Sequence, residues 1–318
     1  WSIRSSIIIK QVFHWIRSGL RGFHNDIEKW FYCSISIFNE TIQMKKFFFF
    51  TIISFFCLSA SAQHSLEKLW ETDSIFKVPE SVLFDAGPNT LYVSNIDGKD
   101  PWGADGVGSV GKMNADGSNI EVEWVKGLNA PKGMGLFKGK LYVADLTELV
   151  VINTATGNIE ERIKIDGAGG LNDISVDKKG VVYVSDSKTK KVFMVREGKA
   201  ETLLENLKGP NGILAYKKDF YVLDAGGLYK MNGDKSLRML VDGMEGGTDG
   251  VENVEGGDFI VSTWAGVVYY ISADNTKQIL KDGRPDKMNS ADIGFDPKTK
   301  TVFIPTFWRN SVAAYKVK

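Results

Sequence analysis

The sequence predicts an all-β fold, a six-bladed β-propeller, from three observations. After Gln63, short apolar strands alternate with Gly, Asn and Asp turns, and helical periodicity is nearly absent. A strand of the Tyr-Val type recurs every 38–50 residues, and its last residue falls at Asn95, Asp145, Asp186, Asp224, Thr263 and Thr306. A unit of about 40 residues with four short strands is typical of a propeller blade. Finally, a strand near the N-terminus is available to close the ring.

The first 62 residues differ from the repeats. Met44 begins the stretch MKKFFFFTIISFFCLSASA, in which two lysines, an apolar run and small residues follow in the order of a secretory signal peptide. We expect residues 1–43 to be translated upstream sequence, with a genuine N-terminal extension as the alternative. We expect residues 44–62 to be a signal peptide and residues 63–318 to be a single exported domain, periplasmic or extracellular. The apolar run is too short for a stable membrane anchor, so the mature chain should have no membrane span.

The blades can be followed along the chain by their repeated hairpins. These lie in the segments Asn89–Gly117, Gly139–Gly157, Gly180–Gly198, Asp219–Asp234, Asp258–Asn275 and Lys300–Lys318. The segment Leu66–Phe76 resembles an outer strand, yet no inner strands precede it. We expect it to pair with the last blade, which would close the ring and cover an open strand edge. An open solenoid is the alternative, but it would need capping units that the sequence does not show.

Composition excludes several classes of function. The chain has 39 Lys and Arg against 39 Asp and Glu, and no basic stripe, so we expect no nucleic-acid partner. Its cysteines and histidines are Cys33, Cys57, His14, His24 and His64, all at or before the start of the propeller. The domain therefore lacks a thiol nucleophile, a Ser-His-Asp triad and the usual zinc ligands. Any metal must be held by oxygen, which favours Ca²⁺ or Mg²⁺.

One position at the start of each inner strand carries a distinctive set of side chains. It is occupied in turn by Glu80, Lys132, Asn172, Asn211, Asp249 and Ala291. Equivalent positions surround the axis of a propeller, so four oxygen-bearing groups and one ammonium should converge at the channel mouth. Such oxygens would repel one another or lack partners without a cation, and a hard divalent cation would satisfy them. A glycine follows three of these positions, which would let backbone approach a ligand. The alternative is that Asn, Asp and Gly are ordinary turn residues.

Aromatic residues are expected around the mouth of the channel. Trp102 lies in the long segment Asn95–Ser109, and Trp264 and Trp308 lie in the corresponding loops of the last two blades. These three residues are candidates for the wall of a substrate pocket. The alternative is packing between blades, which we favour for Phe307.

The order Glu, Asn-Asp, Asn-Gly and Asp-Gly around the ring resembles the family of senescence marker protein, gluconolactonase and luciferin-regenerating enzyme. The likeness covers most of Leu66–Lys318, although its blade pattern is shared with NHL-type propellers. The resemblance implies that Glu80, Asn211 and Asp249 hold a divalent cation, that Asn172 contacts substrate, and that Asp249 activates water.

The sequence also departs from that family's pattern. Gly170 stands where family sugar-lactonases carry an arginine, which would form a hydrogen-bonding fork to a sugar-acid lactone. Glu80 lacks the Pro and Trp that typically follow it. Lys132 is a further difference: it would either weaken a cation site or bind an anionic substrate.

The sequence therefore predicts a divalent-metal-dependent hydrolase of a lactone or related ester, acting as a monomer on a small molecule in the channel mouth. Ca²⁺ is the first expectation, with Mg²⁺, Mn²⁺ or Zn²⁺ as alternatives, and Asn172 and Lys132 would orient the substrate. The alternative is a non-enzymatic, NHL-type propeller that binds a ligand or a protein, with a structural metal or none. A family site that has decayed to a scaffold is a third possibility.

Overall fold

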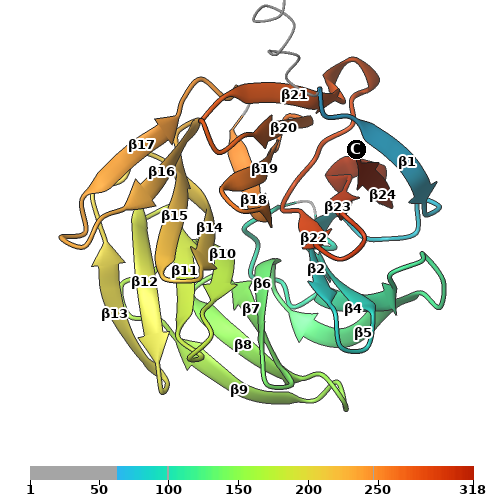
Figure 1. Cartoon of the computed structure of the whole chain (residues 1–318). Coiled ribbons are helices and arrows are strands. Elements are labelled where there is room, and N and C mark those ends of the chain that lie inside the picture. The colour runs from blue at the N-terminus through green and yellow to red at the C-terminus, as the bar shows by residue number, and fades with distance from the viewer. Residues whose placement is uncertain (1–62, 99, 246) are drawn as a thin grey trace, which may run out of the picture. The chain divides into compact units, whose positions relative to one another are not determined.

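The computed structural model describes residues 63–318 except residues 99 and 246. The expected upstream sequence and signal peptide, residues 1–62, lie outside the described residues. The described chain forms six antiparallel sheets of four strands each around a common centre (Figure 1). It contains no α-helix, and two 3₁₀ turns, η1 (Arg284–Asp286) and η2 (Phe307–Arg309), lie in loops. The predicted all-β, six-bladed propeller is confirmed.

Each blade runs from an inner strand at the centre to an outer strand at the rim, and strands follow one another in chain order in the first five blades. Blades 1 to 3 comprise β2 (Pro79–Asp85), β3 (Thr90–Asn95), β4 (Gly108–Asn114), β5 (Glu121–Leu128), β6 (Pro131–Phe137), β7 (Lys140–Asp145), β8 (Glu148–Asn153), β9 (Ile159–Lys164), β10 (Leu171–Val176), β11 (Val182–Asp186), β12 (Lys191–Arg196) and β13 (Lys199–Leu204). Blades 4 to 6 comprise β14 (Pro210–Tyr216), β15 (Asp219–Asp224), β16 (Gly227–Met231), β17 (Leu237–Val241), β18 (Thr248–Glu255), β19 (Asp258–Thr263), β20 (Val267–Ile271), β21 (Lys277–Asp282), β22 (Gly294–Asp296), β23 (Thr301–Pro305), β24 (Val312–Val317) and β1 (Leu66–Glu71).

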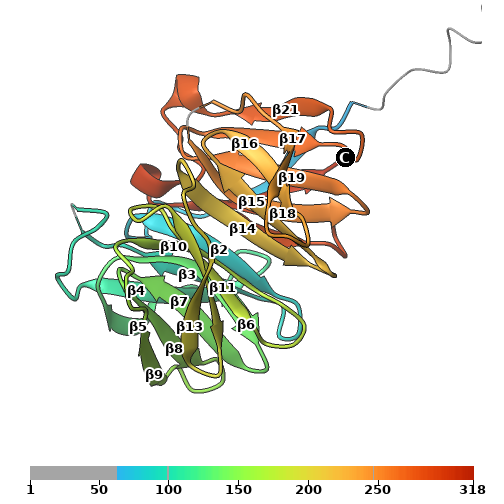
Figure 2. The same ribbon diagram turned by 90° about the vertical axis from the view of Figure 1, so that its left-hand side faces the viewer.

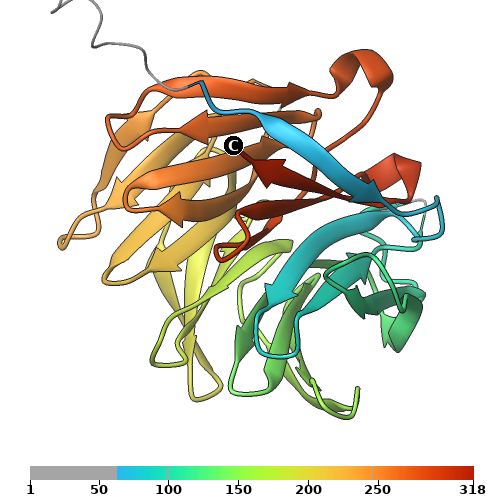
Figure 3. The same cartoon turned by 45° about the vertical axis from the view of Figure 1, so that its right-hand side comes forward.

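The N-terminal strand closes the ring, as the sequence predicts. β1 is the outer strand of the last blade and pairs antiparallel with β24, from Leu66 opposite Val317 to Glu71 opposite Ala313. Figure 3 shows blue β1 lying along dark red β24. The two ends of the domain thus complete one sheet, which protects the backbone groups of β24 from pairing with another chain.

The core lies between the blades. Six apolar clusters among the described residues each join two neighbouring blades, and the one containing Val82 and Phe303 joins blade 1 to blade 6. This distribution explains the sequence pattern, because both faces of each sheet pack against a neighbour and most middle strands are therefore apolar on both faces.

In blades 2 to 4, the aspartate that ends the second strand fixes the chain that enters the blade. Asp145 accepts hydrogen bonds from the backbone N–H groups of Asn129 and Ala130, and Asp224 accepts from those of Lys208 and Gly209, all at 2.6–3.2 Å. Asp186 has the same role in blade 3. These carboxylates hold the loops that lead into the inner strands, so the recurrent aspartate is a structural feature of the fold.

The loops around the channel mouth project from one face of the ring. Figure 2 shows the β3–β4 loop, η1 and η2 on the same side of the propeller. Within the part of the chain that the structure describes, no helix has the length and apolarity to cross a membrane.

Candidate functional site

A β-bulge directs the side chains of the ring residues toward the centre; the ring residues are those at the shared position near the start of each inner strand. The pairing of inner with second strand shifts register at the start of β2, β6, β10, β14 and β18, next to the ring position in each case. Serine hydroxyls from the second strands replace some of the lost ladder bonds: the N–H groups of Ser81, Asp173 and Gly250 donate to serine Oγ atoms at 2.9–3.0 Å. A bulge turns its extra residue out of the sheet, and here it turns that residue toward the axis.

The bulged positions place polar side chains in the interior of the ring. Glu80, Lys132, Asn172 and Asp249 are buried, and Asn211 is half-buried. The sixth position differs, because Ala291 packs in an apolar cluster with Ile96, Ala130 and Phe307. The candidate site is therefore formed by five blades, and its blade-6 side is apolar.

Three oxygen atoms of this ring lack partners. Glu80 Oε2, Asn211 Oδ1 and Asp249 Oδ1 are buried and accept no hydrogen bond within the described residues. Only one other buried side-chain atom there, Thr189 Oγ1, is in the same condition. Buried polar atoms are normally satisfied, so three unsatisfied acceptors in one place indicate a missing positive or hydrogen-bond-donating group. They belong to the three residues that the family resemblance assigns to a cation.

The ionisable groups at the centre, Glu80, Lys132 and Asp249, shift one another's pKa values. Burial raises the pKa of Asp249 well above its usual range, and the negative charges of Glu80 and Asp292 raise it further. Burial also raises the pKa of Glu80, against the opposing effect of Lys132. The Lys132 pKa is lowered by burial, although Glu80 and Asp249 oppose that shift. Lys132 Nζ lies 3.9 Å from Glu80 Oε1, which is too far for a hydrogen bond.

Two further buried aspartates, Asp173 and Asp292, each come one residue after a ring position. They were not predicted as site residues from the sequence. Asp292 Oδ2 accepts a hydrogen bond from Ser81 Oγ at 2.5 Å, and Asp173 accepts from two backbone N–H groups at 2.6 and 2.7 Å. Burial raises the pKa of Asp292 to about 7, and burial together with the Asp292 charge raises that of Asp173. The available signal was the aspartate that follows the ring position in two blades. These acids place two further buried carboxyl groups near the ring, and burial disfavours their ionised forms.

The expectation for the glycines that follow ring positions is wrong. A Cβ on Gly212 would lie 2.2 Å from the backbone oxygen of Asp249, and one on Gly250 would lie 2.6 Å from the backbone nitrogen of Ile293. Each glycine thus packs against the inner strand of the next blade rather than leaving space for a ligand. The physical reason is convergence, because inner strands approach one another most closely at the axis.

Trp102 lies over the blade-2 and blade-3 side of the channel mouth. Its ring centroid is 4.7 Å from Lys132 Nζ and 4.6 Å from Lys188 Nζ. A Cβ on Gly170 would lie 2.9 Å from Trp102 Cζ3 and 2.7 Å from Lys188 Cγ. The place where lactonases of the resembled family carry an arginine is thus occupied by an indole ring and a lysine stem.

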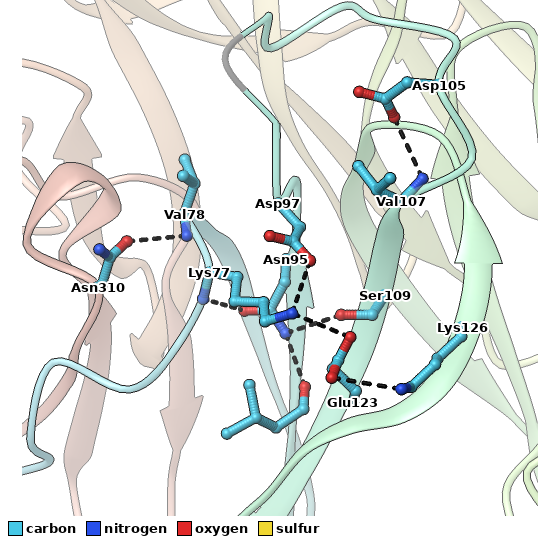
Figure 4. Close-up of polar contacts among 11 residues, drawn as sticks. Lys77, Val78, Asn95, Asp97, Asp105, Val107, Ser109, Glu123, Lys126 and Asn310 are labelled. Carbon is cyan, nitrogen blue, oxygen red and sulfur yellow. Dashed lines mark hydrogen bonds and ion pairs between the residues drawn. The ribbon is translucent and has the colours of Figure 1, made fainter.

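The loop that carries Trp102 is anchored at its base (Figure 4). Lys77 Nζ contacts Asp97 Oδ2 at 2.9 Å and Glu123 Oε1 at 3.1 Å, and Asn95 Nδ2 donates to a backbone oxygen at 3.0 Å. Asp100 Oδ1 accepts the Trp102 N–H at 2.9 Å. The acidic residues of this loop therefore serve local contacts, and they support a defined position for Trp102.

The other two candidate aromatics lie on the opposite side of the mouth. Trp264 and Trp308 are 44% and 49% exposed, and both contact the buried Phe307 edge to face, with centroids 5.7 and 4.8 Å apart. Phe307 packs in the core, as expected. Neither tryptophan lines the cavity described next, so the structure does not bring them together with Asn172 and Asn211.

A cavity of about 560 Å³ opens beside the ring, in blades 3 to 5. Its lining includes Asn172, Ser187, Pro210, Asn211 and Thr248, the residue before Asp249. Asn172 Nδ2 donates to Ser187 Oγ at 3.0 Å, and Ser187 Oγ donates to the Pro210 carbonyl at 2.7 Å, which fixes the Asn172 amide. The volume suits a small organic ligand.

The donor set of the ring fits a hard cation. No group of three or more His, Cys, Asp or Glu residues that could hold a metal occurs among the described residues, so a site here would depend on the amide of Asn211. Two carboxylates and one amide, completed by water, form a set of oxygen ligands that suits Ca²⁺ or Mg²⁺ better than zinc. The three unpartnered oxygens are the observation that favours this fit.

These features define a class: a six-bladed propeller with a polar, acidic centre beside a small-molecule cavity. No known family model matches the sequence, and no curated protein matches it either. Among solved structures, it resembles a gluconolactonase from Xanthomonas campestris with a TM-score of 0.59 and 15% identity, over 79% of this chain and 91% of that one.

Two further solved structures share the fold. Virginiamycin B lyase from Staphylococcus aureus, a catalytically inactive form with quinupristin, gives a TM-score of 0.57 at 12% identity, over 80% of this chain and 99% of that one. A chain of a nidogen/laminin complex gives 0.59 at 17% identity, over 69% and 84%. At such identities the likeness shows the fold alone. These similar structures include both enzymes and a protein of a binding complex, so the function of this chain has to be argued from its site.

Proposed function

We propose that this chain is an exported, divalent-cation-dependent hydrolase of a lactone or related ester. One observation carries the proposal: Glu80 Oε2, Asn211 Oδ1 and Asp249 Oδ1 are buried without partners beside a cavity of suitable size. These three residues would hold the cation, with Ca²⁺ the first expectation. When bound there, a divalent cation supplies Lewis acidity that polarises a carbonyl and lowers the pKa of water.

The chain's own residues supply the remaining functions. Burial raises the pKa of Asp249, so a bound cation would be needed to keep it ionised; the Asp249 carboxylate would then accept the proton of the attacking water as a general base. The Asn172 amide is oriented by Ser187 and presents its oxygen for hydrogen bonding with substrate. Lys132 orients the substrate from the blade-2 side. The apolar surface around Ala291 limits water on the remaining side of the mouth.

A lactone panel tests this proposal. Purified protein is assayed with Ca²⁺, Mg²⁺, Mn²⁺ or Zn²⁺ and again after chelation. We expect hydrolysis that depends on the cation and falls by about 10²-fold or more in Asp249→Asn, which keeps the size of the side chain but removes the base. Asp166→Asn, on an exposed loop, is the matched control. No turnover with any cation, or full activity of Asp249→Asn, would contradict the proposal.

A second function is a non-enzymatic, ligand- or protein-binding propeller. The observation in its favour is the exposed pair Trp264 and Trp308, which lies outside the cavity and which hydrolysis does not require. Here a metal would be structural or absent. Unchanged thermal unfolding in a chelator, together with no bound metal and no turnover, would favour this function over hydrolysis.

Export is part of the proposal because residues 44–62 have the order of a secretory signal peptide. Cleavage after Ala62 would make Gln63 the first residue. Sequencing the N-terminus of protein recovered from outside the cytoplasm tests this directly.

A further inference from the structure

Two ammonium groups share one aromatic ring at the channel mouth. Lys132 and Lys188 come from blades 2 and 3, and each places Nζ within 5 Å of the Trp102 centroid, at 4.7 and 4.6 Å. The proximity of two like charges is costly, and the positive charge of Lys188 contributes to the lowered pKa of Lys132. Contacts with one indole ring compensate such charges only partly, by about 0.5–2 kcal/mol per contact.

Lys132 lacks a hydrogen-bond acceptor. Its side chain is 4% exposed, and among the described residues its Nζ makes no hydrogen bond; Glu80 Oε1, at 3.9 Å, is the carboxylate it faces. Lys188 forms no ion pair within the described part of the chain, and it is exposed. Because the Lys132 side chain is almost fully buried and its three donors have no acceptor among the described residues, a ligand or water is left to accept from them.

The two lysines adjoin residues that line the cavity without lining it themselves: a Cβ on Gly133, the residue after Lys132, would lie 2.9 Å from the Asn172 backbone oxygen. Asn172 and Ser187 line the cavity, and Ser187 directly precedes Lys188. None of the lining side chains carries a charge. The cavity therefore has a neutral lining, and the ammonium groups next to its lining residues are those of Lys132 and Lys188.

We propose that the substrate carries a carboxylate group, which binds between Lys132 and Lys188 at the edge of the Trp102 ring. Lys188 is then a specificity-determining residue. It is exposed, and it is not one of the residues that would hold the metal ion. The assignment of a substrate class rests on the proposed hydrolytic function, but the anion-binding site does not. A neutral lactone supplies only uncharged acceptors to the two ammonium groups, whereas a carboxylate supplies two oxygen atoms that accept charge-assisted hydrogen bonds, which are stronger.

Calorimetry of the purified, chelator-treated protein tests the site without turnover. The probes are glucarate and glucitol, a dicarboxylate and a neutral alcohol with the same carbon chain. We expect glucarate to bind, glucitol not to bind, and Lys188→Met and Lys132→Met each to weaken glucarate binding by about tenfold or more, the loss expected for a hydrogen-bonded charge. Lys217→Met is the matched control, because Lys217 makes a similar cation–π contact with Tyr216 at 4.8 Å in the β14–β15 turn.

Three results would overturn the inference. These are equal binding of glucarate and glucitol, unchanged glucarate affinity in Lys188→Met, and tighter binding of inorganic phosphate than of glucarate. Lys188→Met keeps the test valid if Lys132→Met fails to fold, since Lys188 is exposed.

Activity separates this inference from the proposed function. The matched substrates are glucarolactone and gluconolactone, which differ in a terminal carboxylate. We expect kcat/KM to favour glucarolactone and Lys188→Met to reduce that preference by about tenfold, mainly through KM. Hydrolysis without a preference would overturn the carboxylate assignment and leave the hydrolase proposal standing. Binding of glucarate that depends on the two lysines, without hydrolysis of any lactone, would overturn the hydrolase proposal and leave the anion-binding site standing.

Discussion

Lys132 Nζ faces Glu80 Oε1 at 3.9 Å in the centre of the channel, and both side chains are buried. The ammonium and a divalent cation would therefore compete for the same carboxylate. Lys132 offsets part of the negative charge of Glu80 and Asp249, which lowers the repulsion between them when no cation is present. We therefore expect Lys132 to limit the affinity of the proposed cation site.

Replacing Lys132 by methionine should tighten cation binding. Two unit charges about 4 Å apart interact by up to about 4 kcal/mol at an effective dielectric constant of about 20, so even a fraction of that repulsion raises affinity tenfold or more. Calcium titration by calorimetry measures the change, with Lys217→Met as the control. Equal or weaker calcium affinity in Lys132→Met would show that the ammonium does not share the cation's carboxylates.

Stability without a cation should fall as the pH rises from about 4 to 7. Burial raises the pKa of Asp292 to about 7 and also raises those of Asp173 and Asp249. In this window the folded state holds protons that the unfolded state has released. The free energy of unfolding therefore decreases with pH, by up to about 1.4 kcal/mol per pH unit for each such group.

Urea unfolding in a chelator across this pH range measures that slope. Asp292→Asn should flatten it, and Asp166→Asn, at an exposed position, should leave it unchanged. Saturating calcium should also oppose the loss, because a cation favours the ionised carboxyls of the ring. A stability that rises with pH in the chelator would contradict the buried, proton-holding centre.

Gly212→Ala should destabilise the protein by about 2 kcal/mol, a typical cost of overpacking. The new methyl group would lie 2.2 Å from the Asp249 backbone oxygen and 2.8 Å from Leu223 Cδ1, so blades 4 and 5 would have to separate. Gly233→Ala is the control, since a Cβ there meets nothing within 4 Å. Chemical denaturation of both variants checks the prediction, and similar stabilities for the two would refute the close approach of the inner strands.

Trp70→Ala should weaken the closure of the ring. Trp70 lies in β1, its ring is 6.0 Å from that of Phe303, and it packs over Gly117. We expect a loss of about 2–3 kcal/mol from the lost burial and a tendency to associate through the β24 edge. Leu69→Ala, in the same strand but 50% exposed, should have little effect. Thermal unfolding with light scattering distinguishes the two, and a stable monomeric Trp70→Ala would argue against the strand as a closing element.

The fold could be predicted from the sequence because each blade repeats a local rule. Strand alternation, turn residues and the unpaired strand Leu66–Phe76 together specify six similar sheets and their closure. The convergence of Glu80, Asn211 and Asp249 was predictable for the same reason, since equivalent positions in repeats become neighbours around an axis. Their unpartnered oxygens are consistent with the predicted cation site, whose metal stays a prediction.

The rest of the site depends on contacts between blades, which no local pattern reveals. Asp292 and Ser81 lie at opposite ends of the sequence and meet only because the ring closes. No sequence pattern pointed to Lys188 as a site residue. Its proposed role depends on contact with Trp102, whose loop reaches it from blade 1. Trp102, Trp264 and Trp308 were predicted as pocket walls from their loops, and none of them lines the cavity; Trp264 and Trp308 each contact the buried Phe307 instead.

A crystal structure of the protein grown with calcium is the decisive test of the proposed cation site. We expect one ion at the axis, bound by Glu80 Oε2, Asn211 Oδ1 and Asp249 Oδ1 at about 2.3–2.6 Å and completed by water. Ion-free density at the axis, with Lys132 or ordered water satisfying those three oxygens, would contradict it.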